Sequence, residues 1–284
     1  MKIAVFPALT GRPEAGRATV RRAWRLTCRY AVGCVDLGTV ARGGKDTLMR
    51  FTRLARLAAA TVMAGAAALV APAAAQAAVP VGGGTPILVG GVAGCTIAAA
   101  GVDAAGTPVA FTAAHCSDHI DAPVILRNDE QAGVIGTVVT RNEILDYSVI
   151  RLDPAVAFPV RQAGVTGRAG APDFGDIVCK DGLTTGHTCG VTWQREGARF
   201  WSQACAGHGD SGGPITHNGR LVGLLSGGHM PPAAGPAGSL GPVLPSCVHP
   251  AQSPFFLPAL GYSFYAIVDD ATARDWPGQG FQMA

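Results

Sequence analysis

Short apolar runs separated by turn residues are the sequence feature that most limits how this chain can fold. The chain has 39 Gly and 20 Pro among 284 residues, and only 14% of its residues are charged. This composition is typical of a turn-rich β protein and argues against a helical bundle or a coiled coil. The clearest example is Pro214–Ser226, where two apolar runs flank Asn218-Gly219, a strong signal for a two-residue hairpin turn.

The apolar runs recur at regular intervals along the later part of the chain. Gly, Pro, Asn and Asp interrupt them, and a bridge rich in Gly and Pro spans Ala163–Pro172. Many short strands of this kind predict a barrel or a sandwich, and no repeat or long amphipathic helix is visible. The predicted strands are Cys95–Ala100, Val109–Thr112, Pro123–Leu126, Gly133–Val139, Ser148–Leu152, Asp176–Lys180, Cys189–Gln194, Arg199–Ala204, Pro214–Thr216, Arg220–Ser226 and Tyr262–Ile267.

Charge divides the chain near residue 77. Residues 1–77 contain 12 Lys and Arg against 3 Asp and Glu, whereas residues 78–284 contain 10 against 16. The basic balance of the whole chain therefore belongs to its first part. Because the second part is acidic, we do not expect it to bind nucleic acid through bulk charge.

The first part has the layout of a secretory signal. Arg50, Arg53 and Arg56 precede the apolar run Leu57–Val70, and the small-residue site Ala75-Gln76-Ala77 follows. This order predicts a cleaved signal peptide. We therefore expect residues 1–77 to be a leader and residues 78–284 to be one exported domain, secreted and without stable membrane association after cleavage.

The signal lies unusually far from the first residue. Met49 comes directly before its charged segment, so we expect Met49 to be the true start. The alternative is a long cytoplasmic tail followed by an uncleaved membrane anchor. The apolar run is short for a membrane span, which favours the signal peptide.

The eight cysteines divide at the same boundary. An even number of cysteines in a secreted chain indicates disulfides, here three, with 15 possible pairings. No C-x-x-C pattern is present in the chain, so we expect no structural metal site. Cys28 and Cys34 lie in the leader, and the exported part contains Cys95, Cys116, Cys179, Cys189, Cys205 and Cys247.

Three short segments contain the residue types of a nucleophilic site. They are Thr112-Ala113-Ala114-His115-Cys116 after a predicted strand, Asp146-Tyr147-Ser148-Val149-Ile150 at the start of another, and Gly209-Asp210-Ser211-Gly212-Gly213-Pro214 in a turn. Each segment alone is more often structural than functional. Together they supply what acyl transfer needs: a serine hydroxyl, a histidine to take its proton and a carboxylate to orient that histidine.

These segments resemble those of the trypsin-like serine peptidases. The finer resemblance is to the bacterial branch of α-lytic protease and the streptogrisins, and it spans roughly Ile87 to Ile267. Val178–Gly190 resembles a disulfide-closed loop of that branch, and Cys205 precedes Ser211 by the six residues typical of it. Leu225–Gly228 and Phe255–Pro258 resemble streptogrisin segments.

The resemblance implies two antiparallel six-stranded β-barrels with the active site in the cleft between them. The first barrel would span about residues 87–165 and the second about 166–284. His115 would act as base and then acid, Asp146 would orient it, and Ser211 would be the nucleophile. The N–H groups of Gly209 and Ser211 would form the oxyanion hole.

The same resemblance selects one disulfide pairing and a substrate edge. It implies the pairs Cys95–Cys116, Cys179–Cys189 and Cys205–Cys247. Ser226 would hydrogen-bond Asp146, and Ser226, Gly227 and Gly228 would pair with the substrate backbone as an added strand.

Asp210 needs a cationic partner, because an unpaired buried carboxylate is costly. Ile87-Leu88-Val89-Gly90-Gly91 follows Pro86, so no Lys or Arg marks a trypsin-like activating cut. We expect Lys180 to form an internal ion pair with Asp210. The alternative is a solvated surface lysine.

The sequence departs from the family it resembles in two places. Only the residues from 78 to 86 separate Ala77 from Ile87, where the relatives usually have a large pro-region. Residues 229–246, rich in Pro and Gly, are longer than the corresponding loop. Cys205 also stands where a trypsin-like enzyme has its specificity Asp, so we expect a small or medium apolar side chain at the cleavage site.

These observations predict a secreted, monomeric serine endopeptidase that hydrolyses polypeptides through an acyl-enzyme on Ser211. No cofactor and no metal are expected. Two alternatives stay open: a non-catalytic secreted binding protein on the same scaffold, and an esterase that uses the same three residues.

Overall fold

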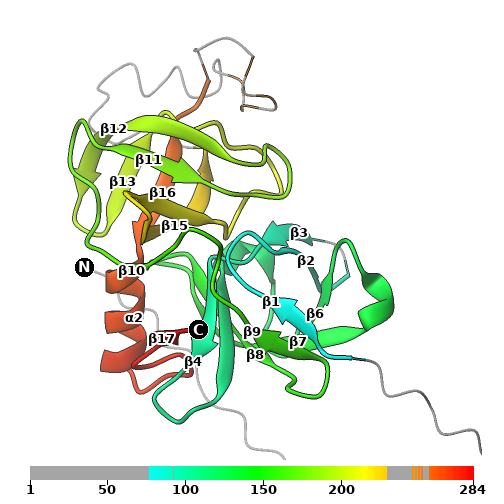
Figure 1. Cartoon of the computed structure of the whole chain (residues 1–284). Helices are drawn as coiled ribbons and strands as arrows, with labels where there is room; N and C mark the ends of the chain where they lie inside the picture. Colours follow the sequence, from blue (N-terminus) through cyan, green and yellow to red (C-terminus); the bar gives the residue numbers. More distant parts are fainter. Residues whose placement is uncertain are drawn as a thin grey trace, which may run out of the picture. The chain divides into compact units, whose positions relative to one another are not determined.

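The computed structural model describes residues 77–91, 93–228, 245, 247, 249, 251 and 256–284 (Figure 1). Several sequence-based predictions lie outside these residues. They concern the start at Met49, the signal segments Arg50–Gln76, the leader cysteines Cys28 and Cys34, nearly all of the loop 229–246, and Phe255.

The second barrel is a closed antiparallel sheet in which each strand pairs with the next around a ring. The pairing of β15 with β16 closes it. Its hairpin turn has positive φ at both Asn218 (49°) and Gly219 (68°), as a two-residue turn of this type requires. The six strands are β11 (Ile177–Lys180), β12 (Thr188–Glu196), β13 (Arg199–Ser202), β14 (Pro214–His217), β15 (Arg220–Gly228) and β16 (Ala259–Ser263).

The first barrel is a strongly curled sheet in the order β17-β4-β5-β8-β7-β6-β2-β3. One predicted strand, Cys95–Ala100, divides here into β3 and β4. The last strand of the chain, β17, returns to pair with β4 (Figure 1). The strands are β2 (Pro86–Val89), β3 (Ala93–Thr96), β4 (Ala99–Val102), β5 (Pro108–Thr112), β6 (Pro123–Leu126), β7 (Val134–Asn142), β8 (Tyr147–Leu152) and β17 (Gln282–Met283).

Short elements fill the connections between these sheets. β1 (Val79–Val81) pairs in parallel with β9 (Ala157–Pro159), and β10 (Gly167–Arg168) pairs in parallel with β15. Two single turns of 3-10 helix, η1 (Ala114–Cys116) and η2 (Glu130–Ala132), follow β5 and β6. The expected all-β fold of the chymotrypsin-like double barrel is confirmed. The second barrel is closed by six strands as expected, whereas the first is a curled sheet of eight strands.

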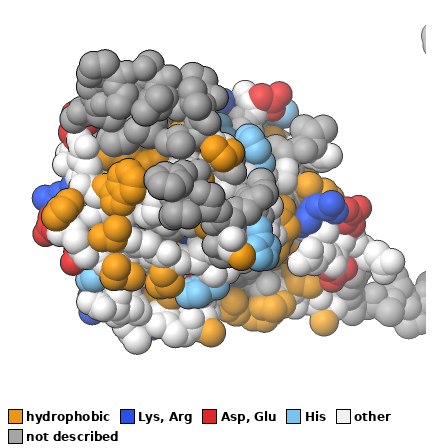
Figure 2. All heavy atoms as spheres, turned by 90° about the horizontal axis from the view of Figure 1, so that it is seen from above, with side chains coloured by type: hydrophobic (Ala, Val, Ile, Leu, Met, Phe, Trp, Pro, Cys, Tyr) orange, Lys and Arg blue, Asp and Glu red, His pale blue; other side chains and the backbone are white. Residues whose placement is uncertain are grey.

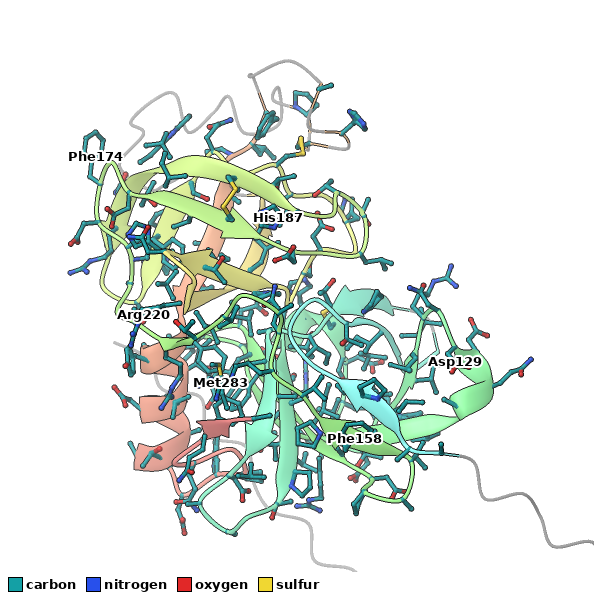
Figure 3. All side chains as sticks on the ribbon, viewed as in Figure 1. Asp129, Phe158, Phe174, His187, Arg220 and Met283 are labelled. Carbon is teal, nitrogen blue, oxygen red and sulfur yellow. A yellow bond between two sulfur atoms is a disulfide. The ribbon has the colours of Figure 1, made fainter. Side chains whose placement is uncertain are left out.

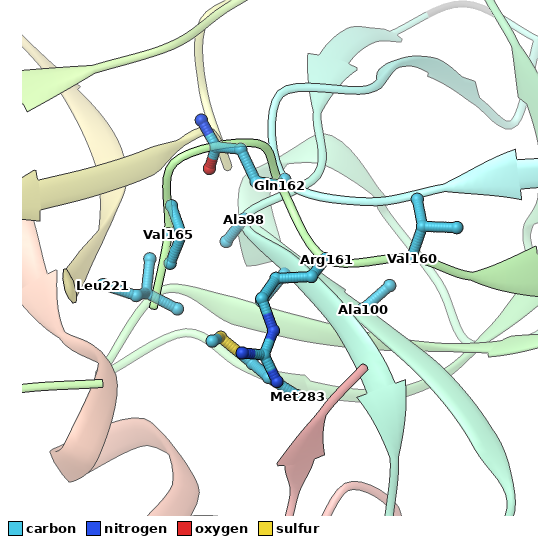
Figure 4. Close-up of a pocket in the computed structure, with 10 residues that line it drawn as sticks. Ala98, Ala100, Val160, Arg161, Gln162, Val165, Leu221 and Met283 are labelled. Carbon is cyan, nitrogen blue, oxygen red and sulfur yellow. The ribbon is translucent and has the colours of Figure 1, made fainter. Parts of the chain in front are cut away.

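The chain between the barrels fits tightly against both. Val165 packs beside Leu221 of β15 and Ala98, which lies between β3 and β4 (Figure 4). The space left among these side chains is about 10 Å³, which is at the lower limit for one water molecule. The barrels are therefore joined here by close packing and not across a ligand pocket.

The predicted strand Tyr262–Ile267 is wrong in its second half. β16 ends at Ser263, whose hydroxyl accepts a hydrogen bond from the N–H of Ala266 and so caps the helix α2 (Phe264–Ala273). Phe264, Ile267, Val268 and Ala271 are buried. Their spacing is the helical period, and the short apolar run alone did not reveal it. Within the described residues, no helix has the length and apolar character needed to cross a bilayer.

Aromatic side chains join this helix to the first barrel. Phe111 of β5 is fully buried, and its ring centroid lies 5.3 Å from that of Phe264 and 4.9 Å from that of Phe281. Both pairs have the edge-to-face geometry that aromatic rings favour. His115 follows shortly after β5, so the packing of this aromatic cluster helps to fix the strand that leads to His115.

Replacing Phe111 with Ala is therefore expected to lower the free energy of unfolding by about 3–5 kcal/mol. Phe174→Ala is the matched control. Its side chain is 81% exposed and points outward from the turn before β11 (Figure 3), so the change should stay within about 0.5 kcal/mol. Urea denaturation of both variants measures the difference. Equal losses would show that the cluster does not stabilise the fold.

Candidate active site

A single cleft collects the residues of the three sequence motifs. Its volume is about 660 Å³. His115 and Asp146 reach it from the first barrel, and Ser211 and Ser226 reach it from the second. Figure 2 shows the face of the molecule seen from above, where histidine side chains (pale blue) and hydrophobic side chains (orange) are exposed.

The pairing of β5 with β8 brings His115 and Asp146 together. Thr112 at the end of β5 lies opposite Ser148 near the start of β8. His115 follows β5 and Asp146 directly precedes β8, so both residues lie at the same end of this strand pair. Asp146 adopts a left-handed backbone conformation with φ of 45°, which an Asp accepts more readily than most residues.

The carboxylate of Asp146 accepts hydrogen bonds from three directions. His115 Nδ1 lies 2.9 Å from Oδ2, and the backbone N–H of His115 donates to Oδ1 at 3.1 Å. The hydroxyl of Ser226 donates to Oδ2 at 2.5 Å. An ionised carboxylate only accepts, so Nδ1 carries the proton and Nε2 is left as the basic nitrogen. The imidazole itself is half exposed to the cleft.

Ser211 stands in the glycine-rich turn that precedes β14. Gly209 and Gly212 on either side have φ of 97° and 82°, a conformation that glycine adopts without strain. A side chain at Gly212 would lie 2.2 Å from Thr112 Oγ1, so the turn packs directly against the end of β5. The glycines of this motif therefore let the serine approach the first barrel.

The hydroxyl of Ser211 donates to the carbonyl oxygen of Ser226 at 3.2 Å. Among the described residues it has no hydrogen bond to His115. A serine hydroxyl rotates freely about its side-chain torsion, and such contacts often tighten only when substrate binds. The structure thus brings Ser211 and His115 into one cleft, where the serine hydroxyl is hydrogen-bonded to the carbonyl of Ser226.

Two backbone N–H groups beside Ser211 are free of partners within the described residues. They are those of Gly209 and Ser211. The intervening N–H of Asp210 donates to Gly207 O at 3.1 Å. Unused donors at a nucleophile are what an oxyanion hole requires.

Asp210 is fully buried and is surrounded by donors. Lys180 Nζ lies 3.0 Å from its carboxylate, and Thr185 Oγ1 lies 2.6 Å away. The backbone N–H groups of Thr184, Thr185 and Gly207 also donate, at 2.7, 3.0 and 2.9 Å. Burial alone would raise the pKa of this carboxyl, but the bonds from Thr185 and Gly207 and the charge of Lys180 hold it below its ordinary value.

Lys180 is fully buried as well and faces this carboxylate, so the structure places it where an internal cation was expected. Its ammonium also donates to Thr185 Oγ1 and to Gly186 O. Burial lowers the pKa of Lys180, against the attraction of Asp210. All three of its donor positions are used, as a buried ammonium needs.

The three disulfides join Cys95 to Cys116, Cys179 to Cys189 and Cys205 to Cys247, which are the expected pairs. The first bridges β3 to the turn that carries His115. Cys179, His187 and Cys189 lie close enough together to resemble a set of metal ligands, with His187 Nε2 3.7 Å from Cys189 Sγ. The two cysteine sulfurs are bonded to each other in a disulfide, so neither offers the thiolate that binds a metal.

Sequence reasoning missed three threonines that shape the site. Thr96 Oγ1 donates to Gly209 O at 2.9 Å, Thr185 Oγ1 binds Asp210, and Thr184 Oγ1 binds His208 O. Each lies far along the chain from the residue it contacts. Only the pair Thr184-Thr185 stood inside a recognised segment, and nothing in that segment indicated a contact.

Comparisons with known proteins identify relatives of this fold among solved structures. No protein-family model and no curated protein sequence matches the chain. Several solved structures do match it. A glutamic-acid-specific serine protease aligns with a TM-score of 0.51 at 20% identity, covering 69% of this chain and 98% of that one. The likeness shows that this chain has the fold of the chymotrypsin-like serine proteases.

Two further structures are similar over much of their length. Cellulomonas bogoriensis chymotrypsin aligns with a TM-score of 0.48 at 21% identity, covering 72% of this chain and 98% of that chain. Protease A of Thermobifida fusca aligns with a TM-score of 0.44 at 26% identity, covering 53% and 85%.

Removing the cation from the buried pair should be costly. Lys180→Met leaves Asp210 charged and unpaired, and we expect a loss of about 3–5 kcal/mol in the free energy of unfolding. Arg195→Met is the control, because its ion pair with Asp173 is exposed and should contribute about 1 kcal/mol or less. Urea denaturation measures both.

A double variant separates charge from packing. Lys180→Met combined with Asp210→Asn removes the uncompensated charge, so it should be more stable than Lys180→Met alone. A Lys180→Met protein as stable as the Arg195→Met control would show that the buried pair of Lys180 and Asp210 does not stabilise the fold.

Proposed function

We propose that this protein is a serine endopeptidase that cleaves polypeptides through an acyl-enzyme on Ser211. The observation that carries the proposal is the carboxylate of Asp146 holding His115 Nδ1 in the cleft that also contains Ser211. That contact leaves Nε2 as the base in the cleft that contains Ser211, beside which two backbone N–H groups have no partner within the described residues. The shared fold with a serine protease supports the same reading.

In the first half of the reaction, Ser211 Oγ would attack the carbonyl carbon of the substrate and pass its proton to His115 Nε2. The new C–O bond leaves negative charge on the carbonyl oxygen, which the N–H groups of Gly209 and Ser211 would stabilise. The C–N bond then breaks, and His115 returns the proton to the departing amine.

Water completes the cycle. It would attack the acyl carbon and give a proton to His115, and the bond to Ser211 Oγ would break as that proton returns to the serine. Asp146 would stay ionised throughout and stabilise the charged imidazole. Every proton in this sequence moves through His115, so no cofactor or metal is needed in the proposal.

The edge of β15 gives a place for the substrate backbone. Pairing of β15 with β14 ends at Leu224 opposite Pro214. Gly227 and Gly228 pair with β16 on one side only and line the cleft with Ser226. A peptide added to this open side would continue the sheet. We propose that Ser226, Gly227 and Gly228 hold it there.

The second-barrel wall of the cleft supports a preference for apolar side chains. Ala206, Gly207 and Leu260 line it together with His208 and Tyr262, and no Asp, Glu, Lys or Arg of this barrel lines the cleft among the described residues. We propose that the enzyme prefers a small or medium apolar side chain before the cleaved bond. The loop 229–246, nearly all of which lies outside the described residues, follows directly after Gly228 of this cleft in the sequence.

Export is part of the proposal. Three disulfides and a signal-like segment are typical of secreted proteins. We propose that residues 1–77 are removed and that residues 78–284 act outside the cell as a monomer.

The first test is covalent labelling of the secreted protein with a fluorophosphonate probe. Ser211 Oγ should attack phosphorus, form a P–O bond and expel fluoride, giving one adduct per molecule. Ser211→Ala should not react, and peptide mass spectrometry should locate the adduct on Ser211 alone. The intact mass also shows where the mature chain begins. A folded protein that stays unlabelled would favour the binding-protein alternative, and hydrolysis of a thioester without cleavage of peptides would favour the esterase.

Asp146→Asn tests how the imidazole is held. An amide donates where the carboxylate accepted, so it would favour the wrong tautomer of His115, and kcat should fall about 10⁴-fold. Asp153→Asn is the control, because within the described residues its carboxylate accepts a hydrogen bond only from the N–H of Ala155 in its own turn. Hydrolysis of a denatured protein substrate measures both. Equal activity of the two variants would contradict the role of Asp146.

A further inference from the structure

The two free N–H groups beside Ser211 are not held in the same way. A trans peptide points its carbonyl and its N–H in opposite directions, so whatever binds the carbonyl fixes where the N–H points. The peptide before Ser211 is fixed by backbone alone, because Asp210 O accepts from Gly213 N at 2.9 Å. The peptide before Gly209 is fixed by a side chain.

That side chain is Thr184. Its hydroxyl donates to the carbonyl oxygen of His208. It also lies against Gly209, where a Cβ atom would stand 2.6 Å from Thr184 Oγ1. The N–H of Gly209 consequently points to the side opposite Thr184. Thr184 does not line the cleft, whereas Gly207, His208 and Ser211 do.

The peptide between His208 and Gly209 needs such a restraint. Glycines stand on both sides of His208, and glycine permits backbone conformations that would let this peptide rotate. A rotated peptide would present a carbonyl oxygen where an N–H is required, and it would repel the developing negative charge. The bond to Thr184 is lost in that rotation, so Thr184 favours the orientation with the N–H available.

Thr184 is itself tied to the buried ion pair. Its backbone N–H donates to Asp210 Oδ1 at 2.7 Å, while its side chain is directed to His208. The residue is exposed, and the network around Asp210 does not use its hydroxyl. The hydroxyl can therefore be removed without disturbing the buried charges.

We propose that Thr184 is a positioning residue that orients the peptide between His208 and Gly209, so that the N–H of Gly209 is ready to stabilise the oxyanion. This inference rests on the proposed function and adds to it a residue outside the cleft. Thr184 touches neither substrate nor nucleophile and acts only through the carbonyl of His208.

The test compares Thr184→Val, which keeps the shape and loses the hydroxyl, with Thr184→Ser, which keeps the hydroxyl. The probe is the same fluorophosphonate, whose phosphoryl oxygen would lie in the oxyanion hole. The maximal rate of labelling should fall about tenfold in Thr184→Val, with little change in the probe concentration at half-maximal rate. Thr184→Ser should recover most of the lost rate.

Thr166→Val is the matched control. Thr166 is another exposed threonine whose hydroxyl donates to a backbone carbonyl, that of Gly219 at 3.2 Å, outside the cleft. It should label at the wild-type rate, and thermal unfolding should show all variants equally folded. Wild-type labelling by all three variants would overturn the role of Thr184. Failure of the wild-type protein itself to label would instead overturn the proposed function. A rate loss in Thr184→Val that Thr184→Ser does not recover would assign the effect to packing and also reject the proposal.

Discussion

The buried carboxylate of Asp210 is the group on which the organisation of the cleft depends. It lies in the interior with Lys180 as its cation and takes four further hydrogen bonds, from Thr184, Thr185 and Gly207. A charge at such depth is tolerated only when its partners are in place. Because those partners come from two separate segments, satisfying Asp210 fixes the loop 181–187 against the turn that carries Ser211. The free N–H groups beside the serine follow from that fixed turn.

A second set of bonds places this turn against the other barrel. The N–H of Thr96 donates to Ser211 O at 2.8 Å, and the hydroxyl of Thr96 donates to Gly209 O. Thr112, which ends β5 three residues before His115, donates to Thr96 O at 2.8 Å. Thr96 of β3 and Thr112 of β5 thus connect the turn of Ser211 to the strand that leads to His115. Because both threonines belong to strands of the first barrel, regular elements help to hold the site that the two barrels share.

Local signals in the sequence predicted most of the strands and the residues of the three motifs. The Asn218-Gly219 turn depends only on its neighbours, and the three motif segments stand at the ends of predicted strands. Some contacts across the fold, such as the ion pair of Lys180 with Asp210 and the disulfide pairs, were predicted only through the resemblance to a known family. Other long-range contacts were not predicted at all. Nothing in the pattern places Thr184 beside His208 or returns β17 to pair with β4. The predicted strand Tyr262–Ile267 was wrong because a short, mostly apolar run of six residues suits a strand and a helix equally. The helical spacing becomes visible only once the strand is seen to end at Ser263.

The partner of Asp210 also bears on how such a site becomes assembled. If Asp210 were paired with a newly cut N-terminus, the segment beginning at Ile87 would have to leave the sheet and insert beside this carboxylate. Here Ile87 is fully buried in β2 and paired on both sides, to Cys95 of β3 and to Leu126 of β6. Lys180, one residue beyond a disulfide cysteine, already occupies the position of the cation. The charge that orders the turn is therefore built into the chain, and the arrangement at Ser211 does not require a cut before Ile87.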